Sequence, residues 1–258
     1  MKGKVYLVGG GPGDPELLTV KATKILGRAN IVLHDALVSR EVLALIAPTA
    51  ERIDVGKRAG LKLLTQDEIN ALLVSYARSH EVVVRLKGGD PVIFGRVGEE
   101  ISALREAVVE FEIVPGITAG IAAAAAAGIS LTDRRFASQV LFTTMQRDTP
   151  NRAIQWAGIS STTTLVIYMP GPDYGYAAEQ LRDAGWPLDM PCAIISNASG
   201  PNQAIRSTHL KDLPAETTLA APAVIVVGRV STHAAEHMSH DFGYGMVTSN
   251  PPLKPLVI

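Results

Sequence analysis

Glycines and charged residues are concentrated in one short stretch, residues 82–100, with the sequence VVVRLKGGDPVIFGRVGEE. Its apolar start predicts a buried strand. The Gly-Gly-Asp-Pro turn that follows, residues 88–91, lets the backbone come close to a ligand, and its proline prevents the strand from continuing. Arg96, Glu99 and Glu100 then open a helical pattern, and acids are favourable in the first turn of a helix. We interpret this stretch as the floor of a ligand-binding site.

The same kinds of residue follow the other strands expected in the N-terminal half. Strand patterns at 4–8, 31–33, 52–55, 82–86 and 111–114 alternate with helical patterns, which predicts a mostly parallel sheet covered on both faces. Ligands bind at the carboxyl ends of such strands. Taken singly, the residues found there are typical of turns, helix caps and solvated loops. Together they predict a site along this edge, formed by 9–14, Asp35, Lys57, Asp90 and 115–118.

The first glycine-rich loop, residues 9–15 (GGGPGDP), fits no nucleotide motif well. A phosphate-binding P-loop would end in Gly-Lys-Ser/Thr, which is absent. A dinucleotide fingerprint would place glycine where Asp14 stands, and Pro12 removes an N–H from the turn. A tight strand-to-helix turn capped by Asp14 is therefore an equal alternative to a ligand loop. Arg96 and Glu99 have a comparable alternative as a surface pair across one helical turn.

Composition argues against several classes of protein. A net charge of −1 and 5% aromatic residues provide no basic, aromatic surface for nucleic acid. Six scattered histidines without a metal-binding motif predict no metal site, and the single cysteine, Cys192, is typical of an inert thiol in a reducing compartment. There is no signal-peptide pattern, and no apolar run approaches the ~20 residues that span a bilayer. We expect a soluble cytoplasmic protein that binds neither metal, membrane nor nucleic acid.

The pattern changes at a polar connector near residue 130, which predicts two α/β domains. Residues 1–133 form the expected N-terminal α/β domain with the glycine-rich loop and the charged edge, and an alanine-rich helix at 117–127 is expected to pack tightly against its sheet. Residues 134–240 combine several strand patterns with one strong helical pattern, so we expect a second, mixed α/β domain. The proline-rich end, 241–258, predicts a flexible tail or a segment lying on a neighbouring subunit.

Seven motifs together resemble those of one known family. They extend over roughly residues 3–232, and in order they are VYLVGGGPGDPELLTVKA, IVLHDALVS, VGKR, VVVRLKGGDPVIFGRVGEE, VPGITAGIAAAAAAGISLT, TLVIYMPG and AVIVVGRV. In type and order they are similar to the motifs of the tetrapyrrole methylases. The RLKGGDP-x-x-FGR-x-GEE motif is the most specific of them, because it resembles the motif of members that methylate uroporphyrinogen III.

The resemblance implies S-adenosylmethionine-dependent C-methylation of uroporphyrinogen III at the ring carbons C2 and C7. The product would be precorrin-2, formed through precorrin-1 and used for siroheme, cobalamin or haem d1, with release of S-adenosylhomocysteine. The family's fold implies two α/β domains with the active-site cleft between them, usually in a homodimer. A later precorrin methyltransferase, or a non-catalytic protein that binds a nucleotide or a tetrapyrrole, is the alternative.

The resemblance also carries roles onto individual residues. Asp35 would accept a proton and Lys57 would donate one. The substrate, which carries eight carboxylates, would contact Arg96, Glu99 and Arg134, and arginine binds carboxylates in a bidentate geometry. The cofactor would contact Pro12, Gly88, Gly89, Asp90, Ile93, Thr118, Ala119, Met169 and Ala198.

The sequence departs from the family's usual pattern at four places. Val97 replaces a glycine, which is expected to stiffen its loop, and Asp133 replaces a histidine. His34 replaces a tyrosine, and residues 143–145 are Thr-Thr-Met in place of Thr-Gly-His. These differences leave open a reduced activity or an altered substrate.

Overall fold

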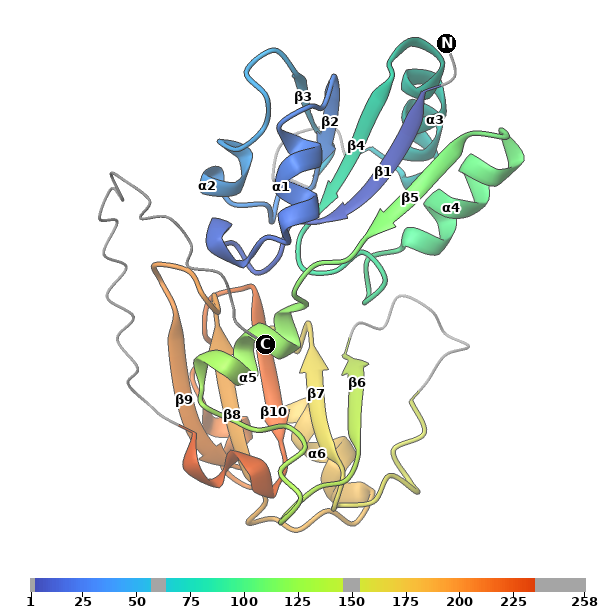
Figure 1. Cartoon of the computed structure of the whole chain (residues 1–258). Helices are drawn as coiled ribbons and strands as arrows, with labels where there is room; N and C mark the ends of the chain where they lie inside the picture. Colours follow the sequence, from blue (N-terminus) through green and yellow to red (C-terminus); the bar gives the residue numbers. More distant parts are fainter. Residues whose placement is uncertain (1–2, 57–63, 146–153, 235–258) are drawn as a thin grey trace, which may run out of the picture.

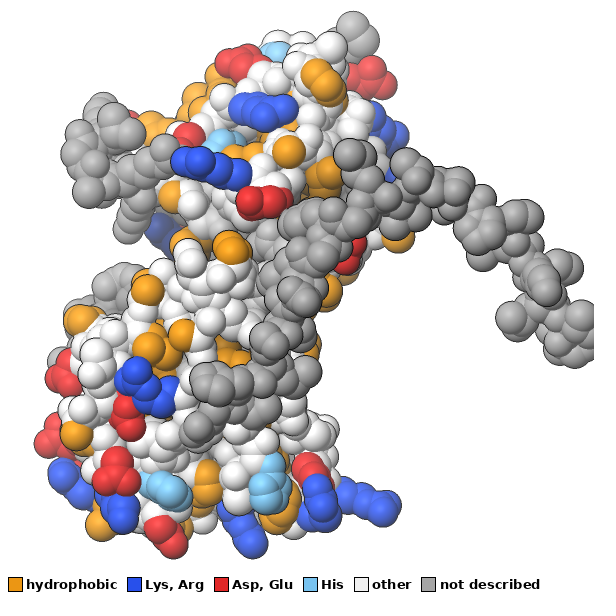
Figure 2. All heavy atoms as spheres, turned by 90° about the vertical axis from the view of Figure 1, so that its left-hand side faces the viewer, with side chains coloured by type: hydrophobic (Ala, Val, Ile, Leu, Met, Phe, Trp, Pro, Cys, Tyr) orange, Lys and Arg blue, Asp and Glu red, His pale blue; other side chains and the backbone are white. Residues whose placement is uncertain are grey.

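The computed structural model describes residues 3–56, 64–145 and 154–234. Figure 1 shows two sheets, one above the other, and Figure 2 shows the same two halves as lobes with a narrower waist between them. Each sheet has five strands, so the predicted α/β class built on two sheets is confirmed. Lys57 and the tail 241–258 lie outside the described residues.

The first sheet is parallel throughout, with the strand order β3-β2-β4-β1-β5. Its strands are β1 (Lys4–Gly9), β2 (Ile31–His34), β3 (Glu51–Asp54), β4 (Val82–Lys87) and β5 (Glu110–Val114), close to the five predicted strands. The central strand β4 ends directly before Gly88, where the Gly-Gly-Asp-Pro turn begins. The parallel order brings the carboxyl ends of β1, β2 and β4 side by side, as expected for a ligand site.

Helices cover both faces of this sheet (Figure 1). They are the 3-10 helix η1 (Pro15–Leu17) and the α-helices α1 (Val20–Leu26), α2 (Arg40–Leu43), α3 (Gln66–Ser79) and α4 (Val97–Glu106). On one face, Leu26 of α1 packs with Leu86 of β4. On the other face, Leu73 of α3 packs with Val83 of β4. Burial of β4 on both faces explains why its sequence is an apolar run rather than an alternating pattern.

The helix predicted directly after Asp14 starts later than expected. Asp14 caps the single 3-10 turn η1 by accepting a hydrogen bond from Glu16 N at 2.8 Å. Leu18 then returns to extended backbone with ψ 145°, and α1 begins only after a second cap. This cap is Thr19, whose Oγ1 accepts a hydrogen bond from Ala22 N at 3.1 Å.

The second sheet contains both parallel and antiparallel neighbours, with the strand order β6-β7-β10-β8-β9. β6 and β7 are parallel, and the other neighbours are antiparallel. The elements are β6 (Val140–Thr144), β7 (Thr164–Tyr168), α6 (Gly175–Asp183), β8 (Pro191–Ser196), β9 (Ala204–His209), η2 (Leu213–Ala215), β10 (Ala223–Val227) and η3 (Arg229–His233). α6 packs on one face, where Leu181 meets Ile167 and Ile225.

The alanine-rich helix packs on the second sheet, which corrects the expectation that it covers the first. α5 (Ala119–Ala126) contacts β7 and β10, and its Ala123 lies in one cluster with Val166 and Ala193. Small side chains allow this close approach: a Cβ atom on Gly120 would lie 2.4 Å from the hydroxyl of Tyr168. By packing, α5 belongs with the second half of the molecule, while the division at residue 133 stays a prediction.

Some features bear on other kinds of function. Within the described ranges, no helix is long and apolar enough to cross a bilayer. In the same part of the chain, no group of three or more His, Cys, Asp and Glu side chains could hold a metal ion. Cys192 is fully buried on β8, and this burial raises the pKa of its thiol, which makes the thiolate scarce.

Candidate functional site

A cavity of about 770 Å³ lies between the two sheets and is lined by residues of both. One wall comes from the carboxyl ends of β1, β2 and β4, and the other comes from the end of β7, the start of β10 and the loop after β8. Its size suits a drug-sized ligand. The cavity brings together Asp35 and all nine residues that the sequence predicts for the cofactor: Pro12, Gly88, Gly89, Asp90, Ile93, Thr118, Ala119, Met169 and Ala198.

Two glycine loops are joined at the floor of this cavity. Gly89 N donates to Gly11 O at 2.7 Å, and Gly11 N donates to Gly89 O at 3.1 Å. A third loop touches them, because a Cβ atom on Gly9 would lie 2.6 Å from Gly116 N and 2.7 Å from Gly89 O. Gly9 is therefore required by backbone packing, whether or not a ligand contacts it.

Asp90 is a buried carboxylate that holds two of these loops in place. Its Oδ1 accepts a hydrogen bond from Val92 N at 2.8 Å, and its Oδ2 accepts one from Gly116 N at 2.9 Å. Each carboxylate oxygen has a further lone pair. Asp90 thus fixes a negative charge on the cavity wall, where a ligand with an ammonium group would be favoured.

Tyr168 is a site residue that the sequence did not single out. Its hydroxyl lies 2.8 Å from Thr118 Oγ1 and accepts a hydrogen bond from Gly120 N at 2.9 Å. Burial raises the pKa of Tyr168, so the phenol stays protonated. Its ring contacts that of Phe94, with a centroid distance of 5.0 Å, and this contact joins the two halves across the cavity. The sequence does contain a clue to this role. A tyrosine at the end of a buried strand usually has a hydroxyl that needs a hydrogen-bond partner.

Several residues around the cavity have left-handed backbone. This conformation is uncommon outside glycine and costs about 1–3 kcal/mol for each residue. Such residues cluster at ligand sites because the surrounding structure fixes their orientation. Phe94 (φ 52°) and Met169 (φ 48°) line the cavity, and Arg96 (φ 54°), Asn197 (φ 48°) and Ser199 (φ 63°) are chain neighbours of the lining residues Gly95 and Ala198.

A buried ionic network lies beneath the Asp35 side of the cavity. Glu100 is fully buried, and its Oε1 accepts hydrogen bonds from Arg85 Nε and Lys87 Nζ, both at 2.9 Å. Arg85 also forms an ion pair with Asp35. Glu100 was interpreted as an acid placed in the first helical turn for the helix dipole. It does lie in that turn, but its charge is matched by two buried cations.

The residues predicted to contact the substrate lie outside the cavity lining. Arg96 and Glu99 bind each other in a bidentate pair, with N–O distances of 2.8 and 2.7 Å, and their side chains are 56% and 50% exposed. In this structure Arg96 and Glu99 therefore form a surface ion pair across one helical turn, which was the alternative to substrate contacts. Arg134 lies in the connector before β6, and the carbonyl of Leu131 in this connector accepts a hydrogen bond from Thr164 at 2.8 Å. Thr164 starts β7, whose other end reaches the cavity.

The four departures from the family pattern have different surroundings. Val97 is the first residue of α4 and is buried in the core, so it packs rather than stiffening a loop. His34 is buried, with its Nδ1 3.2 Å from the carbonyl oxygen of Asp35. Arg135 lowers the pKa of Asp133 to about 2. Met145 lines the cavity.

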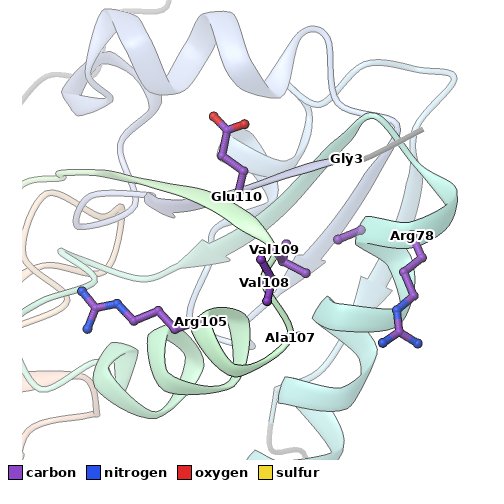
Figure 3. Close-up of a pocket in the computed structure, with 8 residues that line it drawn as sticks. Gly3, Arg78, Arg105, Ala107, Val108, Val109 and Glu110 are labelled. Carbon is purple, nitrogen blue, oxygen red and sulfur yellow. The ribbon is translucent and has the colours of Figure 1, made fainter.

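A second cavity of about 650 Å³ lies at the opposite edge of the first sheet. It is formed by the carboxyl ends of α3 and α4 and the starts of β1 and β5, with Val108 exposed beside it. Figure 3 shows that the side chains of Arg78 and Arg105 point away from one another there. Because its charged groups do not converge and it lies at the amino ends of the strands, we take the first cavity as the candidate site.

The fold and the site together define the class of the molecule. A parallel sheet is joined to a mixed sheet, and the candidate ligand cavity lies between them. Residues 4–214 match the family of Tetrapyrrole (Corrin/Porphyrin) Methylases, and the chain belongs to this family. This confirms the resemblance and the fold class drawn from the motifs.

The chain is similar to several individual proteins in sequence and in structure. It is 46% identical over 242 residues to the uroporphyrinogen-III C-methyltransferase of Synechocystis sp., covering 91% of this chain and 92% of that protein. It is 44% identical to the siroheme synthase of Actinobacillus pleuropneumoniae over 88% of this chain and 47% of that protein, so it spans about half the length of such relatives. The structure of uroporphyrin-III C-methyl transferase from Thermus thermophilus, complexed with S-adenyl homocysteine, is 37% identical with a TM-score of 0.77, covering 88% of this chain and 98% of that one.

Proposed function

We propose that this chain methylates uroporphyrinogen III at C2 and C7 with S-adenosylmethionine, giving precorrin-2 through precorrin-1. The observation that carries the proposal is the cavity between the sheets. It is lined by all nine residues that the family resemblance assigns to the cofactor, with Asp35 at its edge. The 46% identity to a protein named uroporphyrinogen-III C-methyltransferase over nearly its whole length supports the choice of substrate.

The residues of the cavity fit the two chemically different ends of S-adenosylmethionine. The backbone at Gly88 and Gly89 leaves room for the amino-acid part, and the Asp90 carboxylate suits its ammonium group. Met169 and Ala198 offer an apolar wall for the adenine base. When bound, the cofactor supplies a methyl group that is already activated on a sulfonium.

The chain's own contribution is alignment and proton transfer. Loops joined through Gly11 and Gly89 hold the floor rigid, which favours a fixed approach of donor to acceptor. Asp35, held by Arg85, is proposed to take up the proton that leaves the methylated ring. By resemblance, Lys57 is proposed to donate a proton, and Arg96, Glu99 and Arg134 are proposed to contact substrate carboxylates, with a cytoplasmic homodimer as the working form.

Two alternatives differ in chemistry. A later precorrin methyltransferase would share the cavity, but the FGR-x-GEE motif favours uroporphyrinogen III. A non-catalytic binding protein would draw its support from the replacements at His34, which adjoins Asp35, and at Val97. Both alternatives keep the cofactor cavity, so binding measurements alone do not separate them from the proposal.

The test is a turnover experiment without oxygen. Purified protein is incubated with uroporphyrinogen III and S-adenosylmethionine labelled in the methyl group, and the products are analysed by mass spectrometry. We expect a doubly methylated product and two equivalents of S-adenosylhomocysteine. S-adenosylhomocysteine binding by calorimetry without any methylated product would favour the binding protein, and methylation only of a pre-methylated acceptor would favour the later enzyme.

A further inference from the structure

Lys87 is a buried lysine in the wall of the cavity, and nothing in the family resemblance gives it a role. Its side chain is 4% exposed, and its Nζ donates to Glu100 Oε1 at 2.9 Å. An ammonium group carries three N–H donors. Among the described residues, Glu100 is its one hydrogen-bond partner. A buried ammonium with unmet donors is costly, so an oxygen acceptor on the cavity side would be strongly favoured.

The surroundings of Lys87 place it on the Asp35 side of the cavity. Side chains two residues apart on a strand share a face, so Lys87 and Arg85 both lie on the face of β4 that α3 and α4 cover. Glu100 joins the two cations, and Arg85 joins Asp35, which gives a continuous network. A Cβ atom on Gly95 would lie 2.4 Å from the carbonyl oxygen of Pro91 and 3.2 Å from Lys87 Cε, so the loop at Gly95 packs closely over the lysine.

We propose that Lys87 is a specificity residue that binds a carboxylate of the methyl acceptor. This inference rests on the proposed function, in which the acceptor carries carboxylate side chains on every ring. Lysine suits the task because it is a compact charge on a flexible stem. Glu100 holds the Lys87 ammonium in place through their hydrogen bond. Because Glu100 is fully buried, it does not itself contact the acceptor.

The amino-acid part of S-adenosylmethionine also carries a carboxylate, so two sources share this chemistry. The network favours the acceptor, because it links Lys87 to Asp35, the residue proposed to act on the methylated ring. Gly88 and Gly89, by contrast, which are predicted to contact the cofactor, can bind it only through backbone groups and are not part of this ionic network. The experiment below separates the two sources.

The charges around Lys87 make its binding sensitive to pH. Burial, and then Arg85, lower the pKa of Lys87, while Glu100 and Asp35 oppose this shift. Glu99 is also near: its hydrogen bond from Arg96 is the main cause of its lowered pKa, and the charge of Lys87 adds to it. A bound carboxylate favours the charged lysine. Acceptor binding should therefore be strong below the lowered pKa of Lys87 and weaken as the pH rises through it.

The experiment compares the wild type with Lys87→Met and Lys87→Arg, in steady-state methylation of uroporphyrinogen III and in calorimetric binding of S-adenosylhomocysteine. We expect Lys87→Met to raise the KM for the acceptor about 10- to 100-fold, the range for a hydrogen bond to a charged group. Its kcat should change little, and its affinity for S-adenosylhomocysteine should match the wild type. Lys87→Arg should recover most of the KM and should not show the alkaline rise in KM of the wild type.

Other outcomes would overturn the inference. A KM for the acceptor within about twofold of wild type in Lys87→Met would remove Lys87 from substrate recognition. A selective loss of S-adenosylhomocysteine affinity would assign its carboxylate partner to the cofactor. If Lys87→Met does not fold, the alkaline rise in the KM of the wild type and its absence in Lys87→Arg decide the question. An absence of methylated product with the wild type is a different result, because it contradicts the proposed function itself.

Discussion

Arg85 on β4 and Asp35 at the end of β2 form an ion pair between neighbouring strands, and Arg85 is its buried member. The Arg85 side chain is 3% exposed and that of Asp35 is 30% exposed. Arg85 also donates to the Leu86 carbonyl at 3.2 Å and to Glu100 at 2.9 Å, so its guanidinium is fixed in orientation. The pair therefore holds the one carboxylate proposed for proton transfer at the edge of the cavity.

Asp35→Asn should separate binding from chemistry. The amide keeps the shape of the carboxylate but accepts a proton poorly, and removal of a general base typically costs about 10²- to 10⁴-fold in rate. We expect S-adenosylhomocysteine to bind with wild-type affinity while kcat for methylation falls within that range. Calorimetry and single-turnover kinetics measure the two effects. Unchanged turnover would remove Asp35 from the mechanism.

Arg85→Met should destabilise the fold strongly. It leaves Asp35 and the fully buried Glu100 without their shared cation, and loss of one partner of a buried ion pair costs about 3–5 kcal/mol. Urea unfolding measures the change. Arg182→Met is the matched control, because Arg182 pairs with Glu179 on the surface and should cost about 0–1 kcal/mol. Equal losses in the two variants would mean that the network contributes little.

The sequence predicted the strands well because most of them are buried runs with strong boundaries. β4, for example, starts and ends within one residue of the predicted strand, since Gly88 and Gly89 stop it. The ionic network could not be predicted in the same way. Arg85 within an apolar run signals a buried partner, but its partners lie 50 and 15 residues away in the chain, at Asp35 and Glu100.

Helix α5 shows a second limit of sequence reasoning. Its alanines indicate a helix and close packing, yet they do not say which sheet it covers, because a uniformly small and apolar helix has no distinct face. The decisive contacts are with Val166 and Tyr168, which come some 40 residues later. Asp35 and the predicted cofactor residues, in contrast, do converge on one cavity, because each follows a strand of the same parallel sheet or faces it from β7 and β8.

Tyr168→Phe should weaken cofactor binding as well as stability. The change removes the partner of Thr118 Oγ1 and of Gly120 N, and an unsatisfied buried group costs about 1–3 kcal/mol. We expect lower resistance to urea and a reduced affinity for S-adenosylhomocysteine. Tyr6→Phe is the control, because its hydroxyl accepts from Arg28 at 3.1 Å outside the cavity lining, and its affinity should not change. Equal affinity in both variants would show that Tyr168 is only structural.

Gly120→Ala should disrupt the contact of α5 with the second sheet. The added methyl would lie 2.4 Å from the Tyr168 hydroxyl and 2.7 Å from Val166 Cγ1, and overpacking of this kind typically costs about 1–3 kcal/mol. Gly98→Ala is the matched helical control, because a Cβ atom there has nothing within 4 Å. It should stabilise the chain by about 0.5–1 kcal/mol. A stable Gly120→Ala variant with wild-type affinity for S-adenosylhomocysteine would contradict this account of α5.

Val97→Gly restores the residue that the family usually carries, and it should lower stability without raising activity. Val97 is 8% exposed and packs in the core beside α3 and β4, so its removal loses about 1.5–3 kcal/mol of burial, with about 1 kcal/mol more for glycine in a helix. Because Val97 does not line the cavity, kcat and both substrate affinities should remain those of the wild type. Urea unfolding tests the predicted loss of stability, and steady-state kinetics on the same preparation test the predicted unchanged activity. A faster enzyme of unchanged stability would instead mean that valine stiffens the loop before α4.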